Sequence, residues 1–316
     1  MGYLRQYSPF MQLVTFLGLM FAFMMLHSLF MAGFFPAISG GYTIEQFTDP
    51  KVWKDPGFVQ ALKIVQLLYT VVGFLLPACI FAYLAHPRPA QYLGLEQPPK
   101  GSQLLLAVLV VACSLPLVGV TAEWNASWPV SEAIKDLEDM AAEQTKLLLN
   151  MPDAGSMLFS LFLLALLPAI AEEFFFRGVV QRLVMQLVKN GWLAVFITAV
   201  FFSAIHMQFL GFVPRVVLGF VMGAIYFLTG NLWLSIAGHF LNNGLQVVLA
   251  YLFQAKMISY DVMKDEHTPI YFGLFSLLLV GFLLMVLHKR AKAAGQTFDL
   301  PEEPAEEEDQ DSIFKD

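Results

Sequence analysis

The sequence predicts an all-α membrane protein: a polytopic bundle of about eight transmembrane helices plus one amphipathic helix. Of its 316 residues, 58% are hydrophobic and only 14% are charged, whereas soluble domains carry about 25% charged residues. Apolar runs close to the roughly 20 residues that a helix needs to cross a bilayer recur along the whole chain. No stretch remains that would form a separate soluble domain.

Eight apolar segments are the expected spans, and turn residues or charges separate them. The first is too long for the core of a signal peptide and lacks a small-residue cleavage site, so we expect it to be retained. The spans are residues 10–35, 58–84, 102–121, 156–188, 192–209, 213–228, 232–253 and 270–287.

The longest connection precedes the fourth span and contains an expected amphipathic helix within residues 131–150. No Pro or Gly interrupts it, and apolar residues recur near helical spacing from Ala133 to Leu148. Ser131 is a suitable N-cap. We expect this helix to lie on the membrane surface or to cap the bundle, and either a packing role or a substrate-facing role fits the pattern.

The formal net charge of −7 comes from the C-terminus. Nine acids and one base follow from Asp299 onward, so that segment carries −8 and the rest of the chain about +1. We therefore expect an N-terminal part with three spans and the amphipathic helix (1–155), a core with spans four to eight (156–292) and an acidic disordered tail (293–316). Nothing in this distribution favours nucleic acid as a partner.

Eight spans would place both termini on the same side of the membrane. Bases near span ends favour that side as cytoplasmic, although lysines in the opposite loops make the bias modest. We therefore expect a multi-pass protein of the cell membrane, with the lipid bilayer as its partner and both termini cytoplasmic. The bases on the expected cytoplasmic side are Arg5, Arg88, Arg182, Lys189, Lys289, Arg290 and Lys292.

A few polar residues inside the spans indicate a functional site, because they gather on the fourth, fifth and seventh spans. Ionisable groups at membrane depth cost about 2.5–3.5 kcal/mol each on insertion. A chain keeps them only if they pair, face a wet cavity or act chemically. The residues are Glu172, Glu173, Arg177, His206, His239, Asn242 and Asn243.

The fourth span holds two adjacent carboxylates and a guanidinium. Glu173 and Arg177 are four residues apart, so they share a helix face and can form an ion pair. Glu172 is rotated by about 100° from Glu173 on an ideal helix and faces elsewhere. A structural salt bridge would explain Glu173 and Arg177 but not Glu172. We expect Pro168 to kink this helix near the site, because it removes a backbone donor.

The other two spans supply two histidines and two amides. His206 follows Phe202 by four residues near the end of the fifth span, a place where a single histidine is usually interfacial or hydrogen-bonded. His239 and Asn243 share a face of the seventh span, with Asn242 beside them. Hydrogen bonds between helices would also account for this second group.

Together these residues fit two kinds of hydrolytic chemistry. In one, a carboxylate and a histidine activate water while a second histidine and an amide donate hydrogen bonds to a developing oxyanion. In the other, Glu172, His206 and His239 bind Zn²⁺ with an open position for water, and Glu173 is a candidate base. The residues alone do not choose between them.

The motifs Glu172-Glu173-x-x-x-Arg177, Phe202-x-x-x-His206 and His239-x-x-x-Asn243 occur in this order. They resemble the three motifs of the CAAX-protease and bacteriocin-processing family, which are intramembrane proteases related to the type II CAAX prenyl endopeptidases. The resemblance is clearest over residues 156–252, and it makes the segment 156–292 the expected catalytic core.

This resemblance implies roles for individual residues. Glu172 would activate the hydrolytic water with help from His206, and His239 and Asn243 would form the oxyanion site. Glu173 and Arg177 would support the site, with Asn242 and Phe202 beside it. The family is classed with metalloproteases, although a metal-free glutamate mechanism is also proposed for it. The implied substrate is a membrane-associated peptide or protein.

Two other functions fit intramembrane polar residues. A proton-coupled transporter would use them as a relay, but the acids lie on one helix and the halves of the chain do not repeat the motif. A non-catalytic immunity or binding protein could keep the same residues as a scaffold. A Glu172→Gln variant that retains its full biological effect would favour this last alternative.

Other sequence features have a purely structural interpretation or none. Gly219 and Gly223 form a small-xxx-small pair, which is typical of close helix packing. Cys79 and Cys113 lie in separate spans, as expected of buried thiols. The tripeptide Asn125-Ala126-Ser127 fits the glycosylation pattern, and we interpret it as a chance match.

Overall fold

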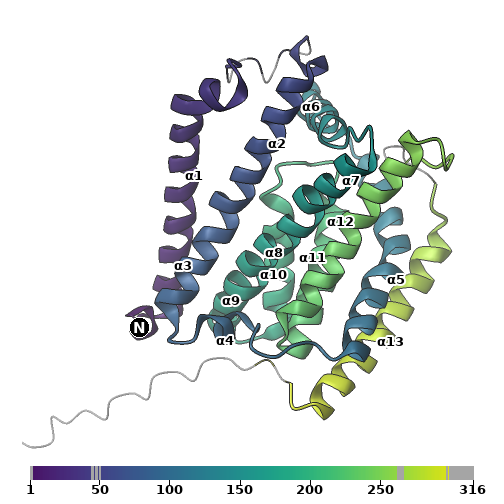
Figure 1. Ribbon diagram of the computed structural model, residues 1–316. Coiled ribbons are helices and arrows are strands. Elements are labelled where there is room, and N and C mark those ends of the chain that lie inside the picture. Colours follow the sequence, from purple (N-terminus) through teal and green to yellow (C-terminus); the bar gives the residue numbers. More distant parts are fainter. Residues whose placement is uncertain are drawn as a thin grey trace, which may run out of the picture.

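A computed structural model of the chain describes residues 3–43, 46, 49, 51–261, 267–296 and 298. Within these ranges the regular elements are helices, which confirms the all-α prediction. The long helices pack side by side as a bundle (Figure 1). The acidic tail expected over 293–316 lies outside the described residues from 299 onward.

The α-helices are α1 (Pro9–Ser39), α2 (Pro56–Thr70), α3 (Leu76–Ala85), α4 (Pro89–Leu93), α5 (Gly101–Ala126), α6 (Glu132–Leu148), α7 (Ala154–Ser160), α8 (Leu167–Glu173), α9 (Arg182–Val188), α10 (Gly191–Ala204), α11 (Phe212–Thr229), α12 (Leu232–Gln254) and α13 (Ile270–Ala293). Two short 3-10 helices, η1 (Tyr3–Gln6) and η3 (Val52–Lys54), lie near the N-terminus. Three segments inside long helices are π-helical, namely η4 (Val71–Leu75), η5 (Leu161–Leu166) and η6 (Phe174–Gln181).

Each expected span contains helix, and the polytopic bundle is confirmed. Among the described residues, six helical stretches are both long and apolar enough to cross a membrane. Of the other two expected spans, α10 has only 14 residues, whereas α12 has 23 but includes three polar site residues. The count of eight therefore stays a prediction. The six stretches are Pro9–Ser39, Pro56–Ala85, Gly101–Ala126, Ala154–Val188, Phe212–Thr229 and Ile270–Ala293.

Helix α10 ends earlier than the expected span, which ran to residue 209. The helix stops at Ala204, and Met207 adopts a left-handed backbone conformation with φ of 54°. A non-glycine residue in that region cannot continue a right-handed helix. Residues 205–211 therefore form a loop, and His206 lies on this loop and not inside the helix.

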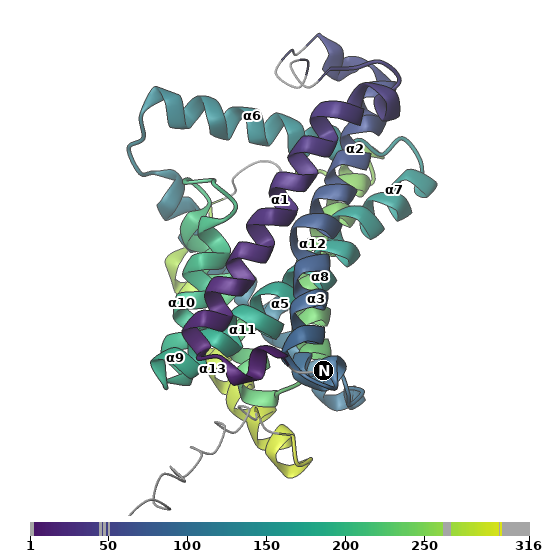
Figure 2. The same ribbon diagram turned by 90° about the vertical axis from the view of Figure 1, so that its left-hand side faces the viewer.

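The predicted amphipathic helix is α6, and it lies across one end of the bundle (Figure 2). Its N-cap is Ser131, as expected, because the Ser131 side chain accepts a hydrogen bond from the Ile134 amide at 3.4 Å. None of its residues is fully buried. Its apolar face is half-buried at Ile134, Met140 and Leu147, and α6 therefore covers the end of the bundle without entering its core.

The fourth span is one continuous helical stretch from Ala154 to Val188, with π-helical segments on both sides of α8. Asp153 caps its start by accepting a hydrogen bond from the Ser156 amide at 2.7 Å, and this bond lowers the pKa of the Asp153 carboxyl. Pro168 lies in the first turn of α8, directly after the segment η5. Wide π turns of this kind are frequent at functional sites.

Aromatic packing fixes the middle of the fourth span in the bundle. Phe175 and Phe176, which follow the two glutamates, are fully buried. The Phe175 ring lies 4.7 Å from Phe16 of α1 and 5.3 Å from Phe74 of η4, measured between ring centroids. Phe176 lies 5.1 Å from Phe202 of α10. The packing of Phe175 and Phe176 thus holds the neighbouring glutamates at a defined position in the bundle.

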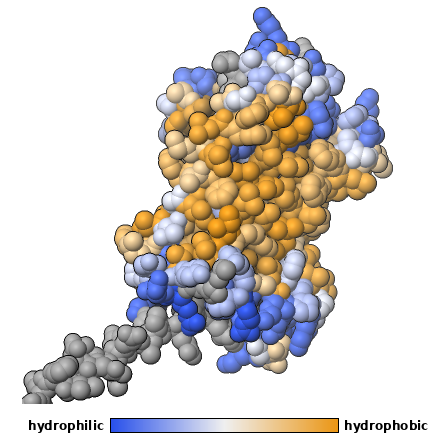
Figure 3. All heavy atoms as spheres, turned by 60° about the vertical axis from the view of Figure 1, so that its left-hand side comes forward, coloured by the Kyte–Doolittle hydropathy of each residue, from blue (hydrophilic) through white to orange (hydrophobic). Residues whose placement is uncertain are grey.

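The surface of the molecule carries a broad apolar band between two polar ends (Figure 3). Large apolar side chains within spans are exposed, such as Phe21 of α1 at 68% and Leu278 of α13 at 74%. Exposed apolar surface of this extent is typical of side chains that contact lipid. The N-terminal end of α1 and the C-terminal end of α13 lie at the same end of the bundle (Figure 1).

The small-xxx-small pair in α11 packs closely, as predicted. A Cβ atom added at Gly219 would lie 3.2 Å from the Ala199 Cα and from Phe202 Cδ1 of α10. A Cβ atom at Gly223 would lie 2.9 Å from the Gln181 side-chain oxygen and 3.1 Å from Val195. Both glycines therefore let neighbouring elements approach α11 directly.

We expect Gly219→Val to lower the thermal stability of the protein in detergent. The added methyl groups would push α10 and α11 apart, and overpacking of this kind costs about 1–3 kcal/mol. The control is Gly281→Val in α13, where an added Cβ meets no atom within 4 Å. Equal changes of Tm in the two variants would contradict the packing role of Gly219.

Candidate active site

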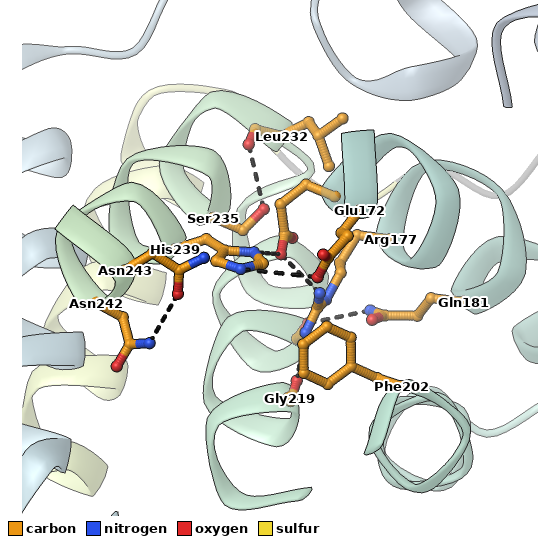
Figure 4. Close-up of polar contacts among 12 residues, drawn as sticks. Glu172, Arg177, Gln181, Phe202, Gly219, Leu232, Ser235, His239, Asn242 and Asn243 are labelled. Atoms are coloured by element: carbon orange, nitrogen blue, oxygen red, sulfur yellow. Dashed lines mark hydrogen bonds and ion pairs between the residues drawn. The ribbon is translucent and has the colours of Figure 1, made fainter. Parts of the chain in front are cut away.

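The polar residues expected on three spans converge in the structure. Glu172, Glu173 and Arg177 come from α8 and η6, and His239 comes from the first half of α12 (Figure 4). One of the short contacts in this group, between Glu173 and His239 at 2.8 Å, joins residues that are 66 positions apart in the sequence. The fold therefore assembles a site that no single helix contains.

Glu173 lies at the centre of the site and is completely buried. Its Oε1 atom accepts a hydrogen bond from Arg177 Nη1 at 2.6 Å and contacts His239 Nδ1 at 2.8 Å. The predicted ion pair between Glu173 and Arg177 is thus present, with both side chains 0% exposed. Because Glu173 has no contact with solvent, its surroundings suit a residue that orients others and not a base that meets water.

Arg177 connects the fourth span to α10 and α11. Its Nη2 atom donates to the Gly219 carbonyl at 3.0 Å, and its guanidinium lies 4.9 Å from the centre of the Phe202 ring. A cation over an aromatic face is favourable, particularly where water is excluded. One guanidinium therefore holds a carboxylate, a backbone carbonyl and an aromatic ring in fixed relative positions.

Glu172 faces a different direction from Glu173, as the helix geometry predicts. Its side chain is 16% exposed, whereas that of Glu173 is fully buried. Its Oε2 atom lies 3.8 Å from His239 Nε2. The two adjacent glutamates therefore contact opposite nitrogens of the same imidazole, and only Glu172 has access to solvent.

The contacts of His239 define which ring nitrogen faces the reaction space. Its Nδ1 atom lies 2.8 Å from the buried Glu173 carboxylate, which cannot donate when ionised, so Nδ1 carries the hydrogen. The other nitrogen, Nε2, points toward Glu172. A carboxylate that fixes the tautomer and the orientation of a histidine in this way is a recurrent feature of functional sites.

His206 lies on the loop after α10 and contacts the backbone of the helix it follows. Its Nδ1 atom lies 2.8 Å from the Phe202 carbonyl oxygen, which requires a hydrogen on Nδ1 and leaves Nε2 as the basic nitrogen. The Phe202 ring lies 5.0 Å from the His206 ring and 6.1 Å from the His239 ring, between centroids. Phe202 is thus the common neighbour of both histidines.

The two asparagines of α12 are linked to each other and to the fourth span. Asn242 Nδ2 donates to Asn243 Oδ1 at 3.0 Å, and Asn243 Nδ2 donates to the Leu164 carbonyl at 3.4 Å. Leu164 lies four residues before Pro168, which has no N–H to donate to it. The proline expected to disturb this helix therefore leaves a carbonyl available for Asn243.

Two residues of this site, Gln181 and Ser235, were not predicted from the sequence. Gln181 donates to the Gly223 carbonyl at 3.0 Å and so repeats, one turn further on, the contact between Arg177 and Gly219. Ser235 is fully buried one turn before His239 (Figure 4). Arg177 and Gln181 are four residues apart, and so are Gly219 and Gly223. This equal spacing is a sequence signal for the two contacts, Arg177 with Gly219 and Gln181 with Gly223.

The residues do not fit a metal ion as they are arranged. Within the ranges that the structure describes, no group of three or more His, Cys, Asp or Glu side chains is placed to hold one. The alternative ligand set of Glu172, His206 and His239 is therefore not gathered around a common point.

Residues 154–245 match the family model described as type II CAAX prenyl endopeptidase Rce1-like. This segment is similar to the CAAX proteases. The matched segment contains every site residue named above, and the resemblance inferred from the three motifs is confirmed. This relationship supports an intramembrane CAAX endopeptidase as the general class of activity. No curated protein and no solved structure matches the chain.

We expect Arg177→Met to destabilise the protein strongly. The substitution leaves the Glu173 carboxylate buried without its cation, and removal of one partner of a buried pair costs about 3–5 kcal/mol. A thermal unfolding curve in detergent measures the loss.

The control for this substitution is Arg88→Met. Arg88 lies 3.9 Å from Glu96, and both side chains are largely exposed. Exposed pairs of this kind contribute about 0–1 kcal/mol, so we expect a small change of Tm. A similar Tm for the two variants would show that the buried pair does not stabilise the bundle.

Proposed function

We propose that this chain is an intramembrane endopeptidase in which Glu172 activates the hydrolytic water. The observation that supports this most is the pair of adjacent glutamates around His239. The buried Glu173 contacts His239 Nδ1 at 2.8 Å, and the partly exposed Glu172 lies 3.8 Å from Nε2. The buried carboxylate of Glu173 thus orients His239, whereas the partly exposed carboxylate of Glu172 can contact water.

The proposed reaction begins when Glu172 accepts a proton from water. The water oxygen then bonds to the carbonyl carbon of the substrate, and the carbonyl oxygen gains a negative charge. In the proposal, His239 acts as an imidazolium with hydrogens on both ring nitrogens and donates to this oxygen through Nε2, and the amide of Asn243 donates through its second N–H. Glu172 returns the proton to the leaving nitrogen as the carbon–nitrogen bond breaks.

In this proposal His206, which also lies beside the Phe202 ring, supports the activation of water. Its hydrogen bond to the Phe202 carbonyl leaves Nε2 free to accept a proton. Glu173, Arg177 and Asn242 position the reacting groups. Several fixed dipoles and charges around a site with little solvent are the arrangement that stabilises a developing oxyanion most effectively.

We infer that the substrate is a membrane-associated peptide or protein. The site lies within the apolar band of the molecule, so a soluble polypeptide would have to enter the bilayer to reach it. Arg5 lies in η1 just before α1, Arg88 is the N-cap of α4, and Arg290 lies in the last turn of α13. The start of α1, helix α4 and the end of α13 lie at the same end of the bundle (Figure 1). This distribution favours a cell-membrane protein with cytoplasmic termini.

We expect Glu172→Gln to abolish cleavage while the fold survives. Glutamine keeps the size of the side chain but cannot accept a proton from water, and loss of a general base costs about 10²–10⁴-fold in rate. The purified protein in detergent would be tested on a library of membrane peptides that includes prenylated CAAX peptides. Its thermal unfolding curve checks the fold.

The matched control is Glu143→Gln, which changes an exposed carboxylate on α6 whose nearest cation is Lys146 at 3.5 Å. We expect this variant to cleave like the wild type. Cleavage by Glu172→Gln at the wild-type rate would refute the role of Glu172. If the wild type cleaves no peptide, the two variants are compared for the effect that the protein has in cells. Loss of this effect in Glu172→Gln would mean that the substrate is outside the library, whereas an unchanged effect would favour a non-catalytic protein.

We expect cleavage to persist after treatment with a metal chelator and dialysis. The described side chains do not gather around a metal position. The comparison is cleavage by the same preparation with chelator, and with chelator followed by excess Zn²⁺. Loss with chelator and recovery with Zn²⁺ would instead make Glu172, His206 and His239 metal ligands.

A further inference from the structure

The loop that carries His206 depends on side chains from outside it. Residues 205–211 connect α10 to α11. The amides of Ile205, His206 and Met207 still donate to carbonyls at the end of α10, and the chain then turns at Met207, which has a positive φ. Backbone polar groups near a membrane need partners, because lipid supplies none. The partners of this loop come from α5, α6, α10 and α11.

Asn125, in the last turn of α5, joins the end of the loop to the start of α11. Its Nδ2 atom donates to the Phe209 carbonyl at 3.2 Å, and its Oδ1 atom accepts from the Val213 amide at 2.8 Å. The first amides of a helix lack partners, and Gly211 at the N-cap of α11 has no side chain to supply one. Asn125 is fully buried, so its glycosylation-like tripeptide is not an accessible acceptor.

Glu138, on α6, holds the middle of the same loop. Its Oε1 atom accepts a hydrogen bond from the Leu210 amide at 3.0 Å. It also attracts the guanidinium of Arg215, which donates to the Gln208 carbonyl and to the Gln208 side chain, both at 2.7 Å. Helix α6 is therefore attached to the loop by a charged contact and not only by apolar packing.

These contacts restrict the position of His206. On one side, its Nδ1 atom is tied to Phe202 of α10 at 2.8 Å. On the other side, Gln208, Phe209 and Leu210 are held by the contacts just described. Only Met207 separates His206 from this fixed part of the chain. A loss of the contacts at 208–210 would let the imidazole shift relative to Glu172.

We propose that Asn125 and Glu138 are positioning residues for His206, an inference that rests on the proposed function of this histidine. Through them, α5 and the amphipathic helix α6 determine the geometry of a group with which neither makes direct contact. Both residues lie outside the segment that matches the CAAX protease family.

The first test compares three α6 variants in the cleavage assay. Glu138→Ala removes the acceptor for the Leu210 amide, and we expect kcat to fall about 10- to 100-fold, since a misplacement of about 1 Å can cost 100-fold. KM and Tm should change little. Glu138→Gln keeps an acceptor oxygen and should recover most of kcat. Glu143→Ala removes an exposed acid on the same helix and should have no effect.

A double-mutant comparison separates positioning from general weakening of the fold. If Glu138 acts through His206, Glu138→Ala should cause no further loss in a His206→Ala background. An equal loss in both backgrounds would overturn the inference. Wild-type activity in His206→Ala alone would instead refute the role of His206 in the proposed function. Asn125→Leu serves as the second variant, with the same expectation if it folds.

A measurement without substrate completes the test. The chain has 6 histidines, so NMR spectra of protein labelled at histidine can follow His206 once His206→Ala identifies its signals. We expect Glu138→Ala to shift the His206 signals and leave those of His288 unchanged, and Glu143→Ala to shift neither. Unchanged His206 signals in Glu138→Ala and in folded Asn125→Leu would overturn the proposal even without a known substrate.

Discussion

The buried ion pair between Glu173 and Arg177 is the interaction on which the site depends. Removal of two charges from water costs several kcal/mol per ion unless further hydrogen bonds satisfy them. Here the two charged side chains also contact three other helices. Their partners are His239 on α12, the Gly219 carbonyl on α11 and the Phe202 ring on α10. The need to satisfy two buried charges therefore aligns the helices that hold the other site residues.

Local rules predicted much of this arrangement. The spacing of four residues gave the Glu173–Arg177 pair and the opposite direction of Glu172, because both follow from helix geometry alone. Ser131 capped the helix that it was expected to cap. The polar residues on three of the expected spans also pointed to segments that meet in the structure, because an unpaired polar group in lipid is costly and such groups therefore tend to find one another.

The rest of the site could not be read from the sequence, because it depends on contacts between distant segments. Nothing local indicates that Glu173 orients His239, which lies 66 positions later. The early end of α10 arises from the left-handed conformation of Met207, a residue type that rarely adopts it. The role of Asn125 was hidden for the same reason, because its partners Phe209 and Val213 lie 84 and 88 positions later in the sequence.

The helices that hold the histidines have a consequence for how the protein is made. Helices α10 and α12 are not among the six stretches that are long and apolar enough to cross a membrane unaided. Between them lies α11, which is among the six and has 56% of its apolar window buried inside the protein. During synthesis, α10 and α12 would thus enter the bilayer together with α11 and with the fourth span that neutralises their polar groups. Assembly of the site and insertion into the membrane would then be one event, and a chain that lacks the buried Glu173–Arg177 pair would be poorly integrated.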